Sequence, residues 1–315
     1  LALPATAEWA IDLYERGQLA IVQGAGYPNP SRSHDVSMAT WQTARLDVEE
    51  HARYGWIGRG LDELPPSHTG AAASTLIGDE ATPLTLRARQ ATSASIRSLD
   101  EMLTAGDDGR AIAALTDDSS ELGSFLRRQT LDAYTTADRL RSLAHPKGQN
   151  DASYPSTTLA GKLKLVSQLI KADMGSRVYY AVQGGYDTHS QQLPTHARLL
   201  RELAGALKAF QRDLQAAGLD QGVLVLCFSE FGRRLAENAS AGTDHGTAGP
   251  VFLAGSPVQP GIYGETPDLS KLATADDPEH TVDFRSVYAT ILEQWLGVPS
   301  GSVLAGTFPQ LALLR

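Results

Sequence analysis

Apolar residues along the chain form short runs and helical stripes that alternate. Four runs of aliphatic, β-branched and aromatic residues predict buried strands at residues 19–23, 177–183, 223–228 and 250–254. Apolar residues three or four apart predict helices at residues 4–16, 34–44, 158–172, 195–217 and 283–296, with another beginning near Trp56. This alternation predicts an α/β fold with a mostly parallel central sheet and helices on both faces.

Residues 64–150 differ in composition from the rest of the chain. They are rich in Ala, Ser, Thr and Asp, and within them the apolar pattern predicts a helix at residues 112–143. No motif in this region points to chemistry. We therefore expect one domain over residues 1–315, in which residues 64–150 form an insertion or cap over the sheet.

Charge and composition exclude several classes of function. The 315 residues are 42 % hydrophobic and 20 % charged, as in ordinary globular proteins. The net charge of −9, with no basic stripe, argues against nucleic-acid binding. No apolar run approaches the roughly 20 residues of a membrane span. Cys227 is the single cysteine, which excludes a disulfide framework and a thiolate metal cluster.

Acidic residues and histidines lie next to three of the predicted strands. Asp187 and His189 follow the strand at 177–183, Glu230 follows the strand at 223–228, and Asp244 and His245 precede the strand at 250–254. In open α/β sheets, ligands bind outside the carboxyl ends of the strands. Carboxylates and imidazoles suit Zn²⁺, Mn²⁺ or Mg²⁺, with Ca²⁺ as a further candidate. The pattern predicts a divalent metal site.

Ser33 adds a candidate nucleophile. It lies between the strand at 19–23 and the helix at 34–44, where first-turn N–H groups and the helix dipole favour an anion. A metal site with a serine hydroxyl is typical of phosphoryl or sulfuryl transfer, and Arg233 or Arg285 could stabilise the anion. The chain has no P-loop, no GxSxG elbow and no GxGxxG fingerprint.

Each of these residues also has a purely structural interpretation. Asp187 and His189 are compatible with a turn or a helix cap, and Glu230 with an ion pair to Arg233 or its neighbour. The segment around Asp244 could be an anchored loop, and Ser33 a plain N-cap. Three further histidines are interpreted as surface or second-shell residues rather than ligands: His34, His196 and His280. The metal hypothesis rests on the segments taken jointly.

Several long motifs resemble the bacterial domain-of-unknown-function 1501 family, which is placed in the alkaline phosphatase and sulfatase superfamily. They are LAIVQGAGYPNPSRSH, WQTA, GWIGRGLD, GGYDTH, FSEFGRR, GTDHGTAGPVFLAG and TVDFRSVYATILEQWLG. The resemblance covers most of the chain outside residues 64–150. It implies a sulfatase-like α/β fold and a twin-arginine export signal upstream, and thus a periplasmic or extracellular protein. It also implies a strand ahead of residue 1 whose loop supplies an Asp ligand.

The resemblance also implies roles for individual residues. Ser33 is similar to the nucleophile position. Asp187 and His189 resemble the Asp and His of one metal site, although they are more closely spaced than is usual. Glu230 stands where the superfamily has an Asp-His pair, with Phe replacing the His, and His245 resembles the final metal-binding His, which Asp244 could join. We expect a metal-dependent hydrolase of small phosphate or sulfate esters. The alternative is a non-catalytic protein that keeps the fold and binds an anion or a partner.

Overall fold

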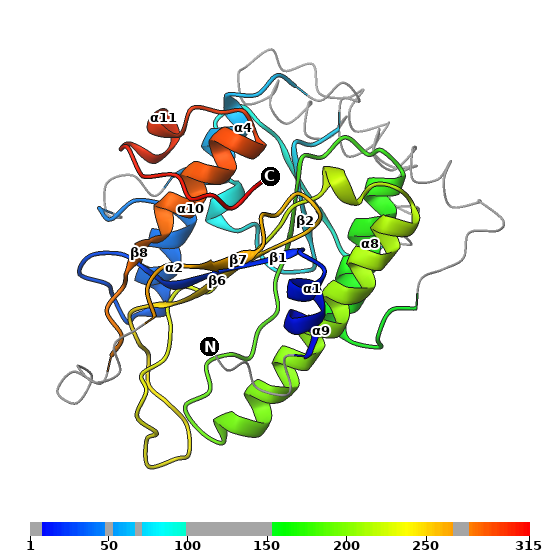
Figure 1. Ribbon diagram of the computed structural model, residues 1–315. Coiled ribbons are helices and arrows are strands. Elements are labelled where there is room, and N and C mark those ends of the chain that lie inside the picture. The colour runs from blue at the N-terminus through cyan, green and yellow to red at the C-terminus, as the bar shows by residue number, and fades with distance from the viewer. Residues whose placement is uncertain (1–7, 48–52, 67–70, 99–152, 267–276) are drawn as a thin grey trace.

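The computed structural model describes residues 8–47, 53–66, 71–98, 153–266 and 277–315 (Figure 1). The helix predicted at 112–143, and most of the proposed insertion, lie outside these residues. Within the described part of the chain, no helix is both long enough and apolar enough to span a membrane.

The central sheet is mixed. Its strands run in the order β5 (Val225–Cys227), β6 (Gly249–Ala254), β1 (Leu19–Gly26) and β7 (Gly261–Tyr263), while β8 (Val282–Asp283) pairs with the end of β1. Strand β6 is antiparallel to both β1 and β5, whereas β7 and β8 are parallel to β1. The α/β class is confirmed, but the prediction of a mostly parallel sheet is wrong.

The direction of β6 has a local cause. A parallel return requires a crossover connection, which is usually a helix. Residues 228–248, which link β5 to β6, contain no helix. They fold back as a loop with paired arms, so the chain re-enters the sheet in the opposite direction. An alternation of strands with helices predicts parallel strands, and this alternation fails at the connection between β5 and β6.

Helices cover both faces of the central sheet, as predicted (Figure 1). In β1, Leu19 and Ile21 pack on one side against α1 (Glu8–Glu15) and α9 (Gln192–Ala216). Ala20 and Val22 point to the opposite face. The helices that cover this second face are α2 (His34–Thr43), α4 (Trp56–Asp62), α10 (Phe284–Thr290) and α11 (Ser300–Leu304). Because successive side chains of a strand alternate in direction, one buried strand anchors two helical layers.

A stack of aromatic rings fixes the end of β5 within the second layer. The buried Trp41 ring of α2 stacks on Phe284 at 4.3 Å and on Phe228 at 5.7 Å between ring centroids. Phe228 directly precedes Ser229 and Glu230. Stacked aromatic pairs add to the stabilisation that burial provides. The carboxyl end of β5 is thereby held against α2, the helix that begins with His34.

A second, smaller sheet is entirely parallel. Its order is β3 (Ser93–Ile96), β2 (Ser74–Ile77) and β4 (Val178–Ala181), and a 3₁₀ turn, η2 (Leu84–Leu86), lies between β2 and β3. The sequence did not predict β2 or β3, because Ser, Thr and Ala dilute the apolar pattern of these segments. Further short turns are η3 (Asp220–Gly222) and the π-helical η5 (Ile291–Trp295), which extends α10.

Helix α8 (Thr158–Lys171) packs along α9, around a buried carboxylate. Asp213 accepts hydrogen bonds from Ser167 at 2.6 Å and Tyr154 at 3.1 Å, and it forms an ion pair with Lys171. Burial alone would raise the pKa of Asp213, but Lys171 and the hydroxyl donors lower it below the usual value. The stabilisation is therefore present above the unfolded pKa of 3.8 and is lost as the pH falls below it.

We expect Asp213→Ala to lower the free energy of unfolding by about 3 kcal/mol, because Lys171 would lose its partner in a buried site. Urea denaturation measures this change. Glu202→Ala is the control, since Glu202 pairs with Arg198 on the exposed side of the same helix and should cost about 0.5 kcal/mol or less. Equal effects of the two substitutions would contradict a buried ion pair.

Candidate metal centre

The ends of three strands meet at one edge of the central sheet. Ala25, near the end of β1, pairs with Gly249 at the start of β6, and Cys227 at the end of β5 pairs with Phe252 of the same strand. Because β6 is antiparallel, its beginning lies beside the carboxyl ends of β1 and β5. The segments that carry His34, Glu230 and His245 therefore leave the sheet at the same edge.

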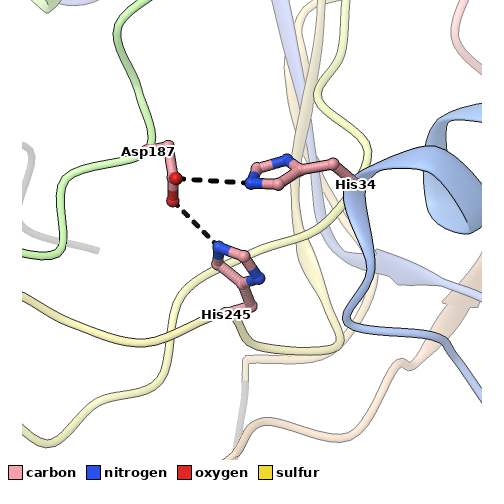
Figure 2. A group of neighbouring side chains, drawn as sticks. All are labelled: His34, Asp187 and His245. Atoms are coloured by element: carbon pink, nitrogen blue, oxygen red, sulfur yellow. Dashed lines mark hydrogen bonds and ion pairs between the residues drawn. The ribbon is translucent and has the colours of Figure 1, made fainter.

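Three imidazoles converge on the carboxylate of Asp187. Its Oδ1 lies 2.9 Å from Nε2 of His245 and 2.9 Å from Nε2 of His189, and its Oδ2 lies 3.3 Å from Nε2 of His34. Figure 2 shows His34 and His245 pointing toward Asp187 from two different segments. Ligand atoms of Asp187, His34 and His245 all lie within 4.8 Å of one another.

The outer nitrogen of each imidazole faces an acceptor. Nδ1 of His245 lies 2.7 Å from the carbonyl oxygen of Arg32, Nδ1 of His34 lies 2.8 Å from Oε1 of Glu230, and Nδ1 of His189 lies 3.4 Å from Oδ1 of Asp244. A carbonyl or carboxylate oxygen accepts only, so each Nδ1 is assigned as the donor. In its neutral form each ring then directs the lone pair of Nε2 at Asp187.

This arrangement suits a cation. Nε2 of His189 and Nε2 of His245 are 2.9 Å apart, and both face Asp187 Oδ1. Neutral rings with protonated Nδ1 atoms would bring lone pairs together there, and either added protons or a cation would relieve the repulsion. Histidines that ligate metals usually donate their other N–H to a carboxylate or a carbonyl, as all three do here. A donor set rich in imidazole fits Zn²⁺ better than Mn²⁺, Mg²⁺ or Ca²⁺, which prefer oxygen ligands.

Electrostatics keep Asp187 ionised. Partial burial would raise its pKa, but the contacts of its carboxylate with the His245 ring and the Arg233 guanidinium lower it to about 2. Nη1 of Arg233 lies 3.0 Å from Asp187 Oδ1, and its Nε donates to Thr243 at 3.2 Å. A carboxylate that is always charged near neutral pH is a constant attraction for a cation.

The pKa values of His34 and Glu230 shift in opposite directions. Their hydrogen bond raises the pKa of His34 above the usual 6.5, against the opposing effect of burial. Burial would raise the pKa of Glu230, but hydrogen bonds from His34 and Ser229 lower it. The hydrogen bond thus favours the imidazolium form of His34 and the carboxylate form of Glu230.

The 228–248 loop positions His245. Arg233 pairs with His245 across its two arms, and the N–H of Gly246 donates to the carbonyl of Gly232 at 2.8 Å. The tip of the loop docks on the segment that carries His189. Asn238 Nδ2 donates to the carbonyl of His189 at 3.0 Å, and a Cβ on Gly242 would lie 2.1 Å from the carbonyl carbon of His189. Only glycine permits this approach of two backbones.

Most residues predicted for the site come together. His189, His245 and Arg233 each contact Asp187, and the two imidazoles also contact each other. Asp244 contacts Nδ1 of His189, and Glu230 contacts Nδ1 of His34. Both carboxylates therefore lie on the sides of the rings that face away from Asp187.

The remaining two predicted residues lie outside these contacts. Ser33 occupies the N-cap position of α2 but its side chain makes no capping hydrogen bond, and it is exposed beside His34. Arg285 instead donates to Asp283 at 2.9 Å and stacks over Phe308.

His34 is the residue that the sequence interpretation undervalued. The sequence predicts a surface residue or one behind the ligands, yet His34 contacts both Asp187 and Glu230. The signal lay in the motif SRSH, because the first helical residue after a central strand lies at the same edge as the strand ends. The sequence also gives no sign that the carbonyl of Arg32 faces His245. The side chain of Arg32 pairs with buried Asp277, and Asp277 accepts a hydrogen bond from the backbone N–H of Thr247 at 2.8 Å.

The fold and site define an α/β protein with a histidine and aspartate cluster at the edge of a mixed sheet. Residues 19–306 match the family described as "Protein of unknown function (DUF1501)", and the chain belongs to this family, as its motifs predicted. No curated protein matches the chain. Among solved structures, it is similar to "Crystal structure of Ps i-CgsB in complex with k-i-k-neocarrahexaose" at 13 % identity and a TM-score of 0.43. That match covers 95 % of this chain and 66 % of the other.

Gly242→Ala should separate the loop tip from the His189 segment, because the added Cβ would collide with backbone atoms. We expect the free energy of unfolding to fall by about 1–3 kcal/mol, with faster amide hydrogen exchange at residues 189–192. Gly184→Ala is the matched control, since a Cβ there meets nothing within 4 Å. Unchanged exchange in Gly242→Ala would show that the tip does not dock as described.

Proposed function

We propose that this chain is a metal-dependent hydrolase-like protein that cleaves phosphate or sulfate esters through Ser33. The observation that carries the metal part is the convergence of the Nε2 atoms of three histidines on Asp187. Asp187, His34 and His245 would hold the ion, with His189 beside them. Asp244 and Glu230 were predicted as ligands from the sequence, and both lie one layer further out.

Ser33 is the proposed nucleophile. It is exposed, its hydroxyl makes no capping bond, and it stands next to His34 at the start of α2, where the helix dipole favours an anion. Its oxygen would bond to phosphorus or sulfur while the alcohol leaves with a proton. Water would then cleave the serine ester and release the inorganic anion. A bound divalent ion supplies Lewis-acid stabilisation of ester oxygens.

Arg233 is the better candidate of the two predicted anion-stabilising arginines. It contacts Asp187, whereas the guanidinium of Arg285 is engaged by Asp283 and Phe308. A serine at a helix start beside acidic and histidine residues also supports placement in the alkaline phosphatase and sulfatase superfamily. Export from the cytoplasm is proposed on the motif resemblance alone.

A non-catalytic binding protein is the alternative. Phe231, which by the motif resemblance replaces a metal-binding His of the superfamily, stacks on His245 at 4.3 Å between ring centroids. An apolar ring cannot hold a second ion, so the site would have at most one metal of the usual pair. Binding of inorganic phosphate or sulfate without any ester turnover would favour this alternative.

Zinc should bind the wild-type protein at one equivalent, and Asp187→Ala should abolish binding because the central carboxylate is removed. Isothermal titration measures both. Asp35→Ala, which removes an exposed carboxylate in the first turn of α2, is the control and should leave the affinity within about twofold. Equal zinc binding by wild type and Asp187→Ala would refute the proposed centre.

Zinc affinity should fall as the pH is lowered from about 8 to about 6, because protons compete for the histidine nitrogens. Because the pKa of His34 is raised above 6.5, part of the loss of zinc affinity should occur above pH 6.5. Titrations in buffers of different ionisation enthalpy should detect proton release on binding, and His34→Gln should reduce it. Affinity that is independent of pH over this interval would contradict histidine ligation.

Ser33→Ala should lower turnover of p-nitrophenyl phosphate or p-nitrophenyl sulfate by at least about 100-fold, because the covalent step would lose its nucleophile. Zinc affinity should not change, since no ligand is removed. Ser302→Ala, in α11, is the control. Undiminished turnover in Ser33→Ala would exclude this serine as the nucleophile while leaving the metal centre intact.

A further inference from the structure

Glu230 lies behind His34 rather than beside Asp187. Its Oε1 is 2.8 Å from Nδ1 of His34, whereas Asp187 faces Nε2 of the same ring at 3.3 Å. The imidazole therefore stands between the two carboxylates. Asp187, His34 and His245 form a group whose ligand atoms are within 4.8 Å of one another, and Glu230 is outside this group. An ion held at Nε2 is separated from Glu230 by the width of the ring.

The Glu230 carboxylate is itself fixed. Its Oε2 accepts from the hydroxyl of Ser229 at 2.7 Å, and its side chain is 16 % exposed, compared with 45 % for His34. It follows Phe228, which the Trp41 stack holds in the core. The next residue, Phe231, packs against the His34 ring at 5.0 Å between centroids. One short segment thus supplies both a hydrogen-bond acceptor and a packing surface to an otherwise exposed imidazole.

We propose that Glu230 is a positioning residue, which orients His34 and holds its proton at Nδ1 so that Nε2 is free to bind the metal. This inference rests on the proposed function, because it assumes a metal at the cluster. Carboxylates that hydrogen-bond to a metal-ligating histidine typically contribute about 10- to 100-fold to metal affinity. Glu230, His34 and the metal would then form a carboxylate–histidine–metal arrangement, in which Glu230 is not a fourth direct ligand.

The test is a double-mutant cycle of zinc affinity at one fixed pH, measured by competition with a chromophoric chelator. Glu230→Ala should weaken binding by about 10- to 100-fold. Glu230→Gln should recover most of this loss, because its amide oxygen accepts the same N–H. In a His34→Ala background, Glu230→Ala should cause no further loss, since the ring that Glu230 orients is gone.

Two outcomes of the double-mutant cycle would overturn the positioning role. Glu230→Gln as weak as Glu230→Ala, or a further loss in the His34→Ala background, would mark Glu230 as a direct ligand. Absence of zinc binding by the wild type would instead remove the proposed function, and this inference with it. Nitrogen-15 spectra of the zinc-loaded wild type provide a readout without substitution: His34 should carry its proton on Nδ1, and zinc on Nδ1 would contradict the proposal.

Discussion

The Asp187 carboxylate and the imidazole nitrogens around it form the interaction on which the rest of the site depends. Nε2 atoms of His245 and His189 lie 2.9 Å from one carboxylate oxygen, and the outer nitrogen of each ring faces an acceptor. With each Nδ1 as the donor, lone pairs meet lone pairs at the centre. A divalent cation, as proposed above, would convert that repulsion into coordination, and protons would compete with it for the ring nitrogens.

The direction of one strand determines whether this cluster can form. If β6 were parallel to β1, the residues before it would leave the opposite edge of the sheet, and His245 would be far from Asp187. The antiparallel register of Ala25 with Gly249 brings that segment to the carboxyl ends of β1 and β5. The loop from 228 to 248 then docks on the His189 segment through Asn238 and the close approach at Gly242.

The local elements were readable from sequence because their signals are local. A stripe of five apolar residues predicted α9: Leu199, Leu203, Leu207, Phe210 and Leu214. Four of them are buried and Leu203 is partly buried. Ser, Thr and Ala masked β2 and β3, whose pairing depends on partners distant in sequence. Adjacency to strand ends predicted Asp187 and His245. The role of His34 was missed, because which neighbour each ring nitrogen meets depends on the loop's three-dimensional path.

The most direct measurement is anomalous diffraction from crystals of the protein grown with zinc. We expect one anomalous peak from a zinc ion bonded to Asp187 and to Nε2 of His34 and His245, at about 2.0–2.2 Å. Glu230 should lie on the far side of the His34 ring. A peak that includes Glu230 in its coordination would contradict the positioning role. Crystals without an anomalous peak at Asp187, whether or not zinc binds elsewhere, would contradict the metal centre itself.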